Sequence, residues 1–97
     1  MRPSEALNAH REQIRRLVAA NHASNPRVFG SVLHCVDTPE SDLDLLVDPI
    51  TGVTTLLDIA GIQIELQALL GVPVDVLTPA ALPEKFRAQV LSEATPI

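Results

Sequence analysis

The sequence predicts a small α/β or α+β domain in which helices flank a sheet of three or four strands. Helix-like and strand-like segments alternate along the 97 residues. A long helix-like segment separates the second candidate strand from the third, as expected for a helical crossover between strands of one sheet. A chain of this length supports one hydrophobic core, so we expect residues 1 to 97 to form a single domain.

Composition narrows the class of protein. Hydrophobic residues make up 46% of the chain and aromatic residues only 2%, so the core must consist of Leu, Val, Ile and Ala. The formal net charge of −5 disfavours a basic nucleic-acid surface, and no direct nucleic-acid binding is expected. Cys35 is the only cysteine, so no internal disulfide is possible. The first residues lack a signal-like apolar segment and no apolar run is long enough for a membrane span, so we expect a cytoplasmic protein.

The first half of the chain predicts a helix followed by a short strand. Residues 4 to 20 are expected to be helical, with Ser4 as the N-cap. Apolar side chains share one face of this helix: Leu7, Ile14, Leu17 and Val18. The Asn, Ser and Pro residues that follow favour a turn. Residues 27 to 29 then form a short strand that ends at Gly30.

The middle of the chain predicts a strand and a longer helix. Residues 42 to 47 are expected to form the second strand. A helix then runs from Thr54, a plausible N-cap, to about Leu70, and Gly71 suits the position just after its end. Four apolar positions support this helix: Leu57, Ile64, Leu66 and Leu69.

The last part of the chain predicts a third strand and a final helix. The apolar run over residues 74 to 77 indicates the strand. Residues 83 to 93 indicate a short helix, with Pro83 near its first turn.

Two aspartates interrupt the apolar second strand. Asp42 and Asp44 are two residues apart, so in a strand both project from the same face, roughly 6.5 to 7 Å apart. Carboxylates this close repel each other, and a divalent cation such as Mg²⁺ removes the repulsion. The alternative is that Asp42 caps the strand and Asp44 faces solvent on an exposed sheet surface.

Two further features favour the metal interpretation. Gly30 and Ser31 directly follow a strand, where a glycine permits close backbone approach and the next N–H groups can face an anion. Asp75 lies within the third strand, between Val74 and Val76, and can complete a set of three carboxylates. An ordinary strand-ending turn and a strand-edge aspartate are the alternatives.

Together these residues carry a family resemblance. Gly30-Ser31, the stretch SDLDLLV at residues 41 to 47, and Asp75 resemble the minimal nucleotidyltransferases of the DNA polymerase beta superfamily. The resemblance covers residues 26 to 78. It implies a mixed sheet flanked by helices in the nucleotidyltransferase fold. It also implies ATP as substrate, two Mg²⁺ ions (or Mn²⁺) and transfer of a nucleoside monophosphate to a hydroxyl group.

The resemblance also implies roles for individual residues. Gly30 and Ser31 would bind the triphosphate, with His34 and Ser41 completing the nucleotide-binding set. Catalysis and metal binding would rest on three carboxylates: Asp42, Asp44 and Asp75. The first two would bind both metal ions, and Asp75 would bind the catalytic ion and help to deprotonate the acceptor.

By its size the chain is most similar to one subgroup, the antitoxins of two-gene HEPN–MNT toxin–antitoxin systems. Such an antitoxin binds a helical RNase toxin as a hetero-oligomer and can attach AMP to a tyrosine of it. The acidic charge balance of the chain suits a protein acceptor better than a nucleic acid. Two alternatives stay open: an antitoxin that neutralises the toxin by binding alone, and a small-molecule nucleotidyltransferase.

One segment departs from the family pattern. The family continues Gly-Ser with x-Ala-Arg-Gly, whereas this chain has Leu33, His34 and Cys35 after Val32. Arginine is a permanent phosphate clamp, but histidine is only fractionally charged near neutral pH. Loss of one such contact costs about 1.5 to 3 kcal/mol of phosphate binding.

Overall fold

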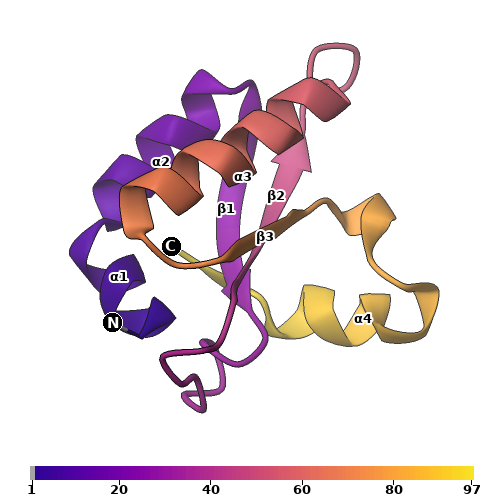
Figure 1. Cartoon of the computed structure of the whole chain (residues 1–97). Helices are drawn as coiled ribbons and strands as arrows, with labels where there is room; N and C mark the ends of the chain where they lie inside the picture. The colour runs from indigo at the N-terminus through magenta and orange to yellow at the C-terminus, as the bar shows by residue number, and fades with distance from the viewer. Residues whose placement is uncertain (1) are drawn as a thin grey trace.

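The computed structural model describes residues 2–97, and Figure 1 shows four α-helices around a small sheet. In chain order the elements are α1 (Pro3–Ala9), α2 (Arg11–Ala20), β1 (Ala23–Phe29), β2 (Leu43–Pro49), α3 (Leu56–Leu70), β3 (Val74–Leu77), the 3₁₀ turn η1 (Pro79–Ala81), α4 (Glu84–Glu93) and β4 (Thr95–Pro96).

The sheet is mixed and has four strands in the order β3-β2-β1-β4. β1 runs antiparallel to both of its neighbours, whereas β2 and β3 are parallel and are joined by the α3 crossover. The predicted fold class is therefore confirmed. The two-residue strand β4 and the turn η1 were not predicted, because neither is long enough to show a hydrophobic period.

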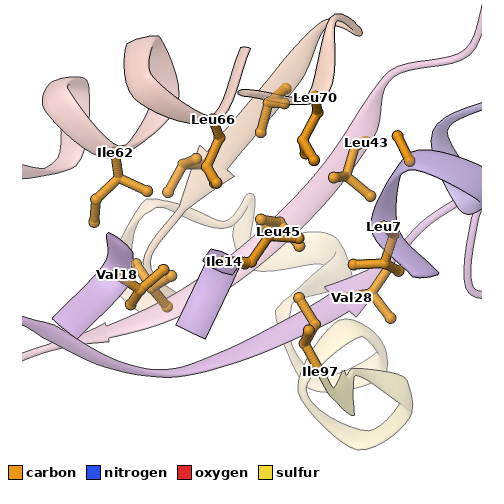
Figure 2. Packing of buried hydrophobic residues seen from close by; sticks show 14 of the residues in the cluster. Leu7, Ile14, Val18, Val28, Leu43, Leu45, Ile62, Leu66, Leu70 and Ile97 are labelled. Carbon is orange, nitrogen blue, oxygen red and sulfur yellow. The ribbon is translucent and has the colours of Figure 1, made fainter. Parts of the chain in front are cut away.

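Helices α2 and α3 lie side by side over one face of the sheet (Figure 1). The odd-numbered apolar residues of β2, from Leu43 to Val47, are fully buried on that face. They pack against apolar side chains of the helices, several of which Figure 2 shows: Leu7, Ile14, Val18, Ile62, Leu66 and Leu70. The alternate residues of β2 and β3 point to the opposite face, called the open face below, because α2 and α3 do not cover it.

The first predicted helix is divided in two, and its predicted N-cap is wrong. His10 leaves the helical conformation (φ −132°, ψ 25°), which separates α1 from α2. The His10 ring bonds the Ala6 carbonyl at 3.1 Å, so it satisfies one backbone group that the break leaves free. Helix α1 begins at Pro3, and the N–H of Ser4 donates to the Asp37 carboxylate at 3.0 Å.

Both early strands differ from the prediction at their ends. β1 begins at Ala23, within the segment predicted to be a turn. Its pairing with β2 shifts register between Ser24 and Arg27, and this bulge accommodates Pro26, which cannot donate to the sheet. β2 begins at Leu43, so Asp42 lies just before the strand.

Helix α3 has nearly the predicted extent. Its N-cap is Thr55, one residue after the predicted Thr54, and Gly71 ends it in the left-handed conformation (φ 68°) as predicted. Of the four apolar positions that supported the helix, Leu66 is buried, but Leu57 and Ile64 are 83% and 65% exposed. The face that packs on the sheet consists of Ile62, Leu66 and Leu70.

Helix α4 follows Pro83 as predicted, but it buries no residue. Arg87 holds its start against η1, because the guanidinium donates to the carbonyls of Pro79 and Leu82 at 3.0 and 2.8 Å. The other end of α4 continues into β4 and the buried Ile97. None of the helices in residues 2–97 has the length and apolar character that a membrane crossing requires.

Candidate active site

The structure brings the three predicted aspartates together on the open face. Asp44 lies in β2, an inner strand of the sheet, where its register partners are Phe29 of β1 and Asp75 of β3. Asp42 precedes Asp44 by two residues and its charge acts on the Asp44 carboxyl. Asp44 is half-buried, whereas Asp42 and Asp75 are exposed.

Nothing in the described chain neutralises these carboxylates. Within residues 2–97, no hydrogen bond or ion pair engages the side chains of Asp42, Asp44 or Asp75. Burial, together with the negative charges of Asp75 and then Asp42, raises the pKa of the Asp44 carboxyl to about 6. The chain therefore holds three acidic groups close together without an internal cation.

The turn after β1 approaches this cluster at Gly30. A Cβ atom on Gly30 would lie 2.3 Å from Oδ2 of Asp44, and the backbone there is left-handed (φ 74°). Only glycine can adopt this left-handed backbone and also leave room for the Asp44 carboxylate without strain. The chain then turns over residues 30 to 35, closed by hydrogen bonds from the N–H of His34 to the Gly30 carbonyl and from Val36 to Ser31. Ser31 thus follows directly on the residue that touches Asp44.

Two of the predicted nucleotide-binding side chains are engaged elsewhere. His34 Nε2 lies 3.2 Å from a carboxylate oxygen of Glu93, the last residue of α4. The Ser41 hydroxyl accepts from the N–H of Thr38 at 2.9 Å and so closes the loop before β2. Glu93 is 59 residues from His34 in the sequence, and no local pattern could have predicted this contact.

The far end of the open face is closed by apolar side chains. Leu46 is fully buried although it lies on the same face as Asp44, and its register partner on β3 is Leu77. Leu82, between η1 and α4, is also buried, and η1 packs against β2. Access to the aspartates is therefore from the end of the sheet that carries Gly30.

The donor set fits a hard divalent cation that also has other ligands. Carboxylate oxygens are the ligands that Mg²⁺ and Mn²⁺ prefer, and the three unpaired aspartates supply them. Residues 2–97 contain no group of three His, Cys, Asp or Glu side chains already arranged to hold a metal ion by themselves. Mg²⁺ commonly completes its shell with water and substrate phosphate oxygens, so an open set of this kind agrees with its chemistry.

A hollow of about 250 Å³ lies elsewhere, beside the turn that follows β1. Its lining comes from α1, the start of α2, β1, β4 and the turn, with Leu7, Val32 and Leu33 among the apolar residues and Arg11 among the polar ones. No aspartate lines it. The unpaired carboxylates, and not this hollow, therefore mark the candidate active site.

The mixed sheet, with its carboxylates beside a strand-ending Gly-Ser turn, defines the class of nucleotidyltransferases. The chain belongs to the nucleotidyltransferase domain family, whose family model matches residues 8–97. A relative from Methanocaldococcus jannaschii, named "Putative protein adenylyltransferase", is 29% identical over 91 residues, which cover 94% of this chain and 97% of the relative.

Solved structures show the same fold. A structure described as a "putative minimal nucleotidyltransferase" is 45% identical, with a TM-score of 0.85 over 97% of this chain and 95% of its own. A toxin–antitoxin complex with AMP-PNP gives a TM-score of 0.70 at 16% identity, covering 97% of this chain and 71% of that chain. A mutant of the toxin–antitoxin complex MntA-HpeT gives 0.69, also at 16% identity, over 87% and 68% of the two chains.

Substitution of Gly30 by alanine should disrupt the site, whereas the same substitution at Gly52 should not. Both glycines are left-handed (φ 74° and 76°), so alanine has a similar backbone cost at either position. An added Cβ at Gly30 meets the Asp44 carboxylate, whereas nothing lies within 4 Å of one at Gly52. We expect Gly30→Ala to weaken Mg²⁺–nucleotide binding at least ~10-fold, and Gly52→Ala to leave it unchanged, by calorimetry. Equal losses in both variants would contradict this role of Gly30.

The stability of the metal-free protein should fall as the pH rises from about 4 to about 6. The folded-state pKa of Asp44 is about 6, above the ordinary 3.8, so the folded protein retains a proton that the unfolded chain releases. The stabilisation is complete below pH 3.8 and is lost as the pH passes 6. Because solvent screens this half-buried carboxylate, the ionised group then costs on the order of 1 to 2 kcal/mol, less than the full pKa shift would give.

Asp44→Asn removes this ionisation and keeps the side-chain shape, so the variant should be more stable than the wild type at pH 7.5. Urea unfolding at pH 4 to 8 without divalent cations measures both proteins. Lowered pKa values at Asp37 and Asp58 act at lower pH and are common to both proteins, so they cancel in the comparison. A stability difference between the two proteins that stays constant from pH 4 to 8 would contradict this prediction. It would show that ionisation of the Asp44 carboxyl does not lower the stability of the fold.

Proposed function

We propose that this protein is a Mg²⁺-dependent protein adenylyltransferase that acts as an antitoxin. It transfers AMP from ATP to a tyrosine hydroxyl of a HEPN-type RNase toxin, with which it forms a hetero-oligomer, and so neutralises that toxin. The observation that carries the proposal is the convergence of Asp42, Asp44 and Asp75, all unpaired within residues 2–97, beside Gly30.

The reaction assigns separate tasks to the residues of the open face. The N–H groups of the turn after Gly30 and the Ser31 hydroxyl hold the triphosphate. Asp42 and Asp44 would hold two Mg²⁺ ions (or Mn²⁺), and these ions would neutralise and orient the phosphates. Asp75 is exposed on the same face, where it can accept the proton of an incoming hydroxyl.

The bond changes follow from this arrangement. The tyrosine oxygen attacks the α-phosphorus of ATP and a new O–P bond forms. The bond from the α-phosphorus to the bridging oxygen breaks, and pyrophosphate leaves with that electron pair. The proton of the hydroxyl passes to the Asp75 carboxylate. No side chain of the enzyme serves as a nucleophile, so activity depends on position and charge.

Three observations support a protein acceptor. The chain has a net charge of −5, which disfavours approach of a nucleic acid. Its relative in M. jannaschii is named as a protein adenylyltransferase, and two proteins of the same fold were solved in toxin–antitoxin complexes. Asp75 and Asp42 are exposed, so a macromolecular acceptor can reach them.

An antitoxin that neutralises by binding alone is the second candidate, and His34 favours it. The imidazole must leave Glu93 before it can contact a phosphate, and it is a weaker cation than the arginine of the family pattern. A nucleotidyltransferase that acts on a small molecule is the third candidate.

Transfer is tested with ATP labelled on the α-phosphate, Mg²⁺ and the purified toxin. The wild type should label the toxin on tyrosine, and Asp44→Asn should lower labelling at least ~100-fold because it removes a metal-binding carboxylate. Complex formation should persist in this variant, as measured by size-exclusion chromatography. The proposal fails if the wild type labels nothing with Mg²⁺ or Mn²⁺ while Asp44→Asn still neutralises the toxin in cells.

The contact between His34 and Glu93 should raise the KM for ATP. Replacing His34 by Arg supplies a permanent cation, and Glu93→Gln removes the carboxylate that competes with phosphate for it. The double variant should lower the KM for ATP by about tenfold, since a charge-assisted phosphate contact contributes about 1.5 to 3 kcal/mol. Glu84→Gln at the start of the same helix, which removes the same charge away from His34, is the control. An unchanged KM would place His34 away from the triphosphate.

A further inference from the structure

The loop that leads into β2 has no buried side chain to hold it in place. Residues 36 to 42 connect the turn after β1 to β2 (Figure 1), and Asp42 is the last of them. The side chains of this loop are exposed except those of Asp37 and Ser41, which are partly exposed. Hydrophobic packing therefore does not fix the loop, and its position depends on hydrogen bonds.

Among the three candidate metal ligands, Asp42 has the least support from the sheet. Asp44 and Asp75 are register partners in neighbouring strands, whereas Asp42 has no register partner within residues 2–97. The next residue, Leu43, begins β2, and its N–H donates to the Pro73 carbonyl at 2.9 Å. The sheet thus fixes the backbone on one side of Asp42, and the loop must fix it on the other.

Asp37 connects this loop to another element of the fold. Its carboxylate accepts a hydrogen bond from the N–H of Ser4, in the first turn of α1, at 3.0 Å. The remaining side-chain hydrogen bonds of the loop join Thr38, Glu40 and Ser41 to one another. These bonds shape the loop but do not attach it to the core. Within residues 2–97, Asp37 is thus the loop side chain that reaches a helix.

Helix α1 is a firm attachment point because the core holds it. Pro3, Ala6 and Leu7 are buried. The N–H of Ser4 belongs to the first turn, where no carbonyl of the same helix can accept from it, so the Asp37 carboxylate satisfies it. This hydrogen bond lowers the pKa of the Asp37 carboxyl, so Asp37 is ionised at neutral pH and the bond is charge-assisted.

Packing between α1 and the turn after β1 does not replace this bond. The hollow of about 250 Å³ is lined by residues of both segments, so the two are not in close contact there. Val36, the first residue of the loop, donates from its N–H to the Ser31 carbonyl at 3.0 Å, which joins the loop to the turn. The bond between Asp37 and Ser4 is therefore the direct link from the loop to a packed helix.

We propose that Asp37 is a positioning residue for the metal site, because it anchors the loop on α1 and so sets the position of the Asp42 carboxylate. This inference rests on the metal-binding role proposed above for Asp42. The Asp37 carboxylate is bonded to α1, so it acts through the loop backbone and is not itself a metal ligand. Removal of a group that orients metal ligands from outside typically lowers metal affinity by about 10- to 100-fold.

Nucleotide binding tests this role when it is compared with a second carboxylate that caps a helix. Asp37→Ala should weaken binding of Mg²⁺ with a non-hydrolysable ATP analogue about 10-fold, by calorimetry. Asp58→Ala is the matched control, since Asp58 accepts from the N–H of Thr55 at 2.9 Å at the start of α3 and its pKa is also lowered. This variant should bind the nucleotide as the wild type does, although urea unfolding should show that both variants lose stability.

Two further variants separate positioning from a general loss of structure. Asp37→Asn keeps the side-chain shape and a neutral acceptor for the N–H of Ser4, so it should fold even if Asp37→Ala does not. Its binding should be weakened about threefold, because a neutral hydrogen bond has roughly half the strength of a charge-assisted one. In the Asp42→Asn background, Asp37→Ala should cause no further loss, because the ligand that it positions is already changed.

The outcomes distinguish this inference from the proposed function. Wild-type affinity in either Asp37 variant, an equal loss in Asp58→Ala, or full additivity with Asp42→Asn would overturn the role of Asp37 and leave the metal site standing. A wild type that binds no nucleotide with Mg²⁺ or Mn²⁺ would overturn the metal site and, with it, the role of Asp37.

Discussion

The mutual repulsion of Asp42, Asp44 and Asp75 is the constraint on which the rest of the structure depends. β2 must bury one face to hold the core together, and its period of two then directs Asp44 to the other face. The parallel register of β3 places Asp75 beside it. The fold itself thus brings like charges together, and burial of Asp44, with the charges of Asp75 and Asp42 added to it, raises the pKa of its carboxyl to about 6. Residues that oppose folding in this way are typical of functional sites.

No described side chain around the three aspartates neutralises their negative charge. The arginines of the described chain are engaged elsewhere, for example Arg27 with Asp48 and Arg87 with carbonyls around η1. Gly30 approaches the Asp44 carboxylate with no side chain in between. A cation on this face must therefore come from solution. Under the proposed function it would arrive with the nucleotide, which would link binding, charge relief and positioning in one event.

Much of the fold could be predicted from the sequence because strong hydrophobic periods specify it. β2, β3 and the end of α3 at Gly71 follow from alternation, apolar runs and a left-handed glycine. The break at His10 was missed because no Pro or Gly marks it. The side of α3 that packs on the sheet was not predicted, since α3 is apolar on both sides and periodicity alone does not identify the packed one.

The candidate site was predictable where its residues are neighbours in the sequence. Asp42, Asp44 and Gly30 belong to one short stretch, and the strand pattern placed Asp75 beside them. The contact between His34 and Glu93 was not predictable, because it depends on where α4 returns to the first turn. The sequence pattern also does not distinguish the two apolar faces of α3. One face packs on the sheet, and the other is exposed.

The most direct test of the central claim is to locate the cation on the molecule. Mn²⁺ added with a non-hydrolysable ATP analogue broadens the amide NMR signals of residues near the bound ion. The three aspartates and Gly30 should lose their signals first, and residues of α3 such as Leu57, on the opposite side of the sheet, should keep theirs. Broadening centred instead on Glu40 and the loop before β2, or none at all, would contradict the claim that the converging carboxylates form the metal site.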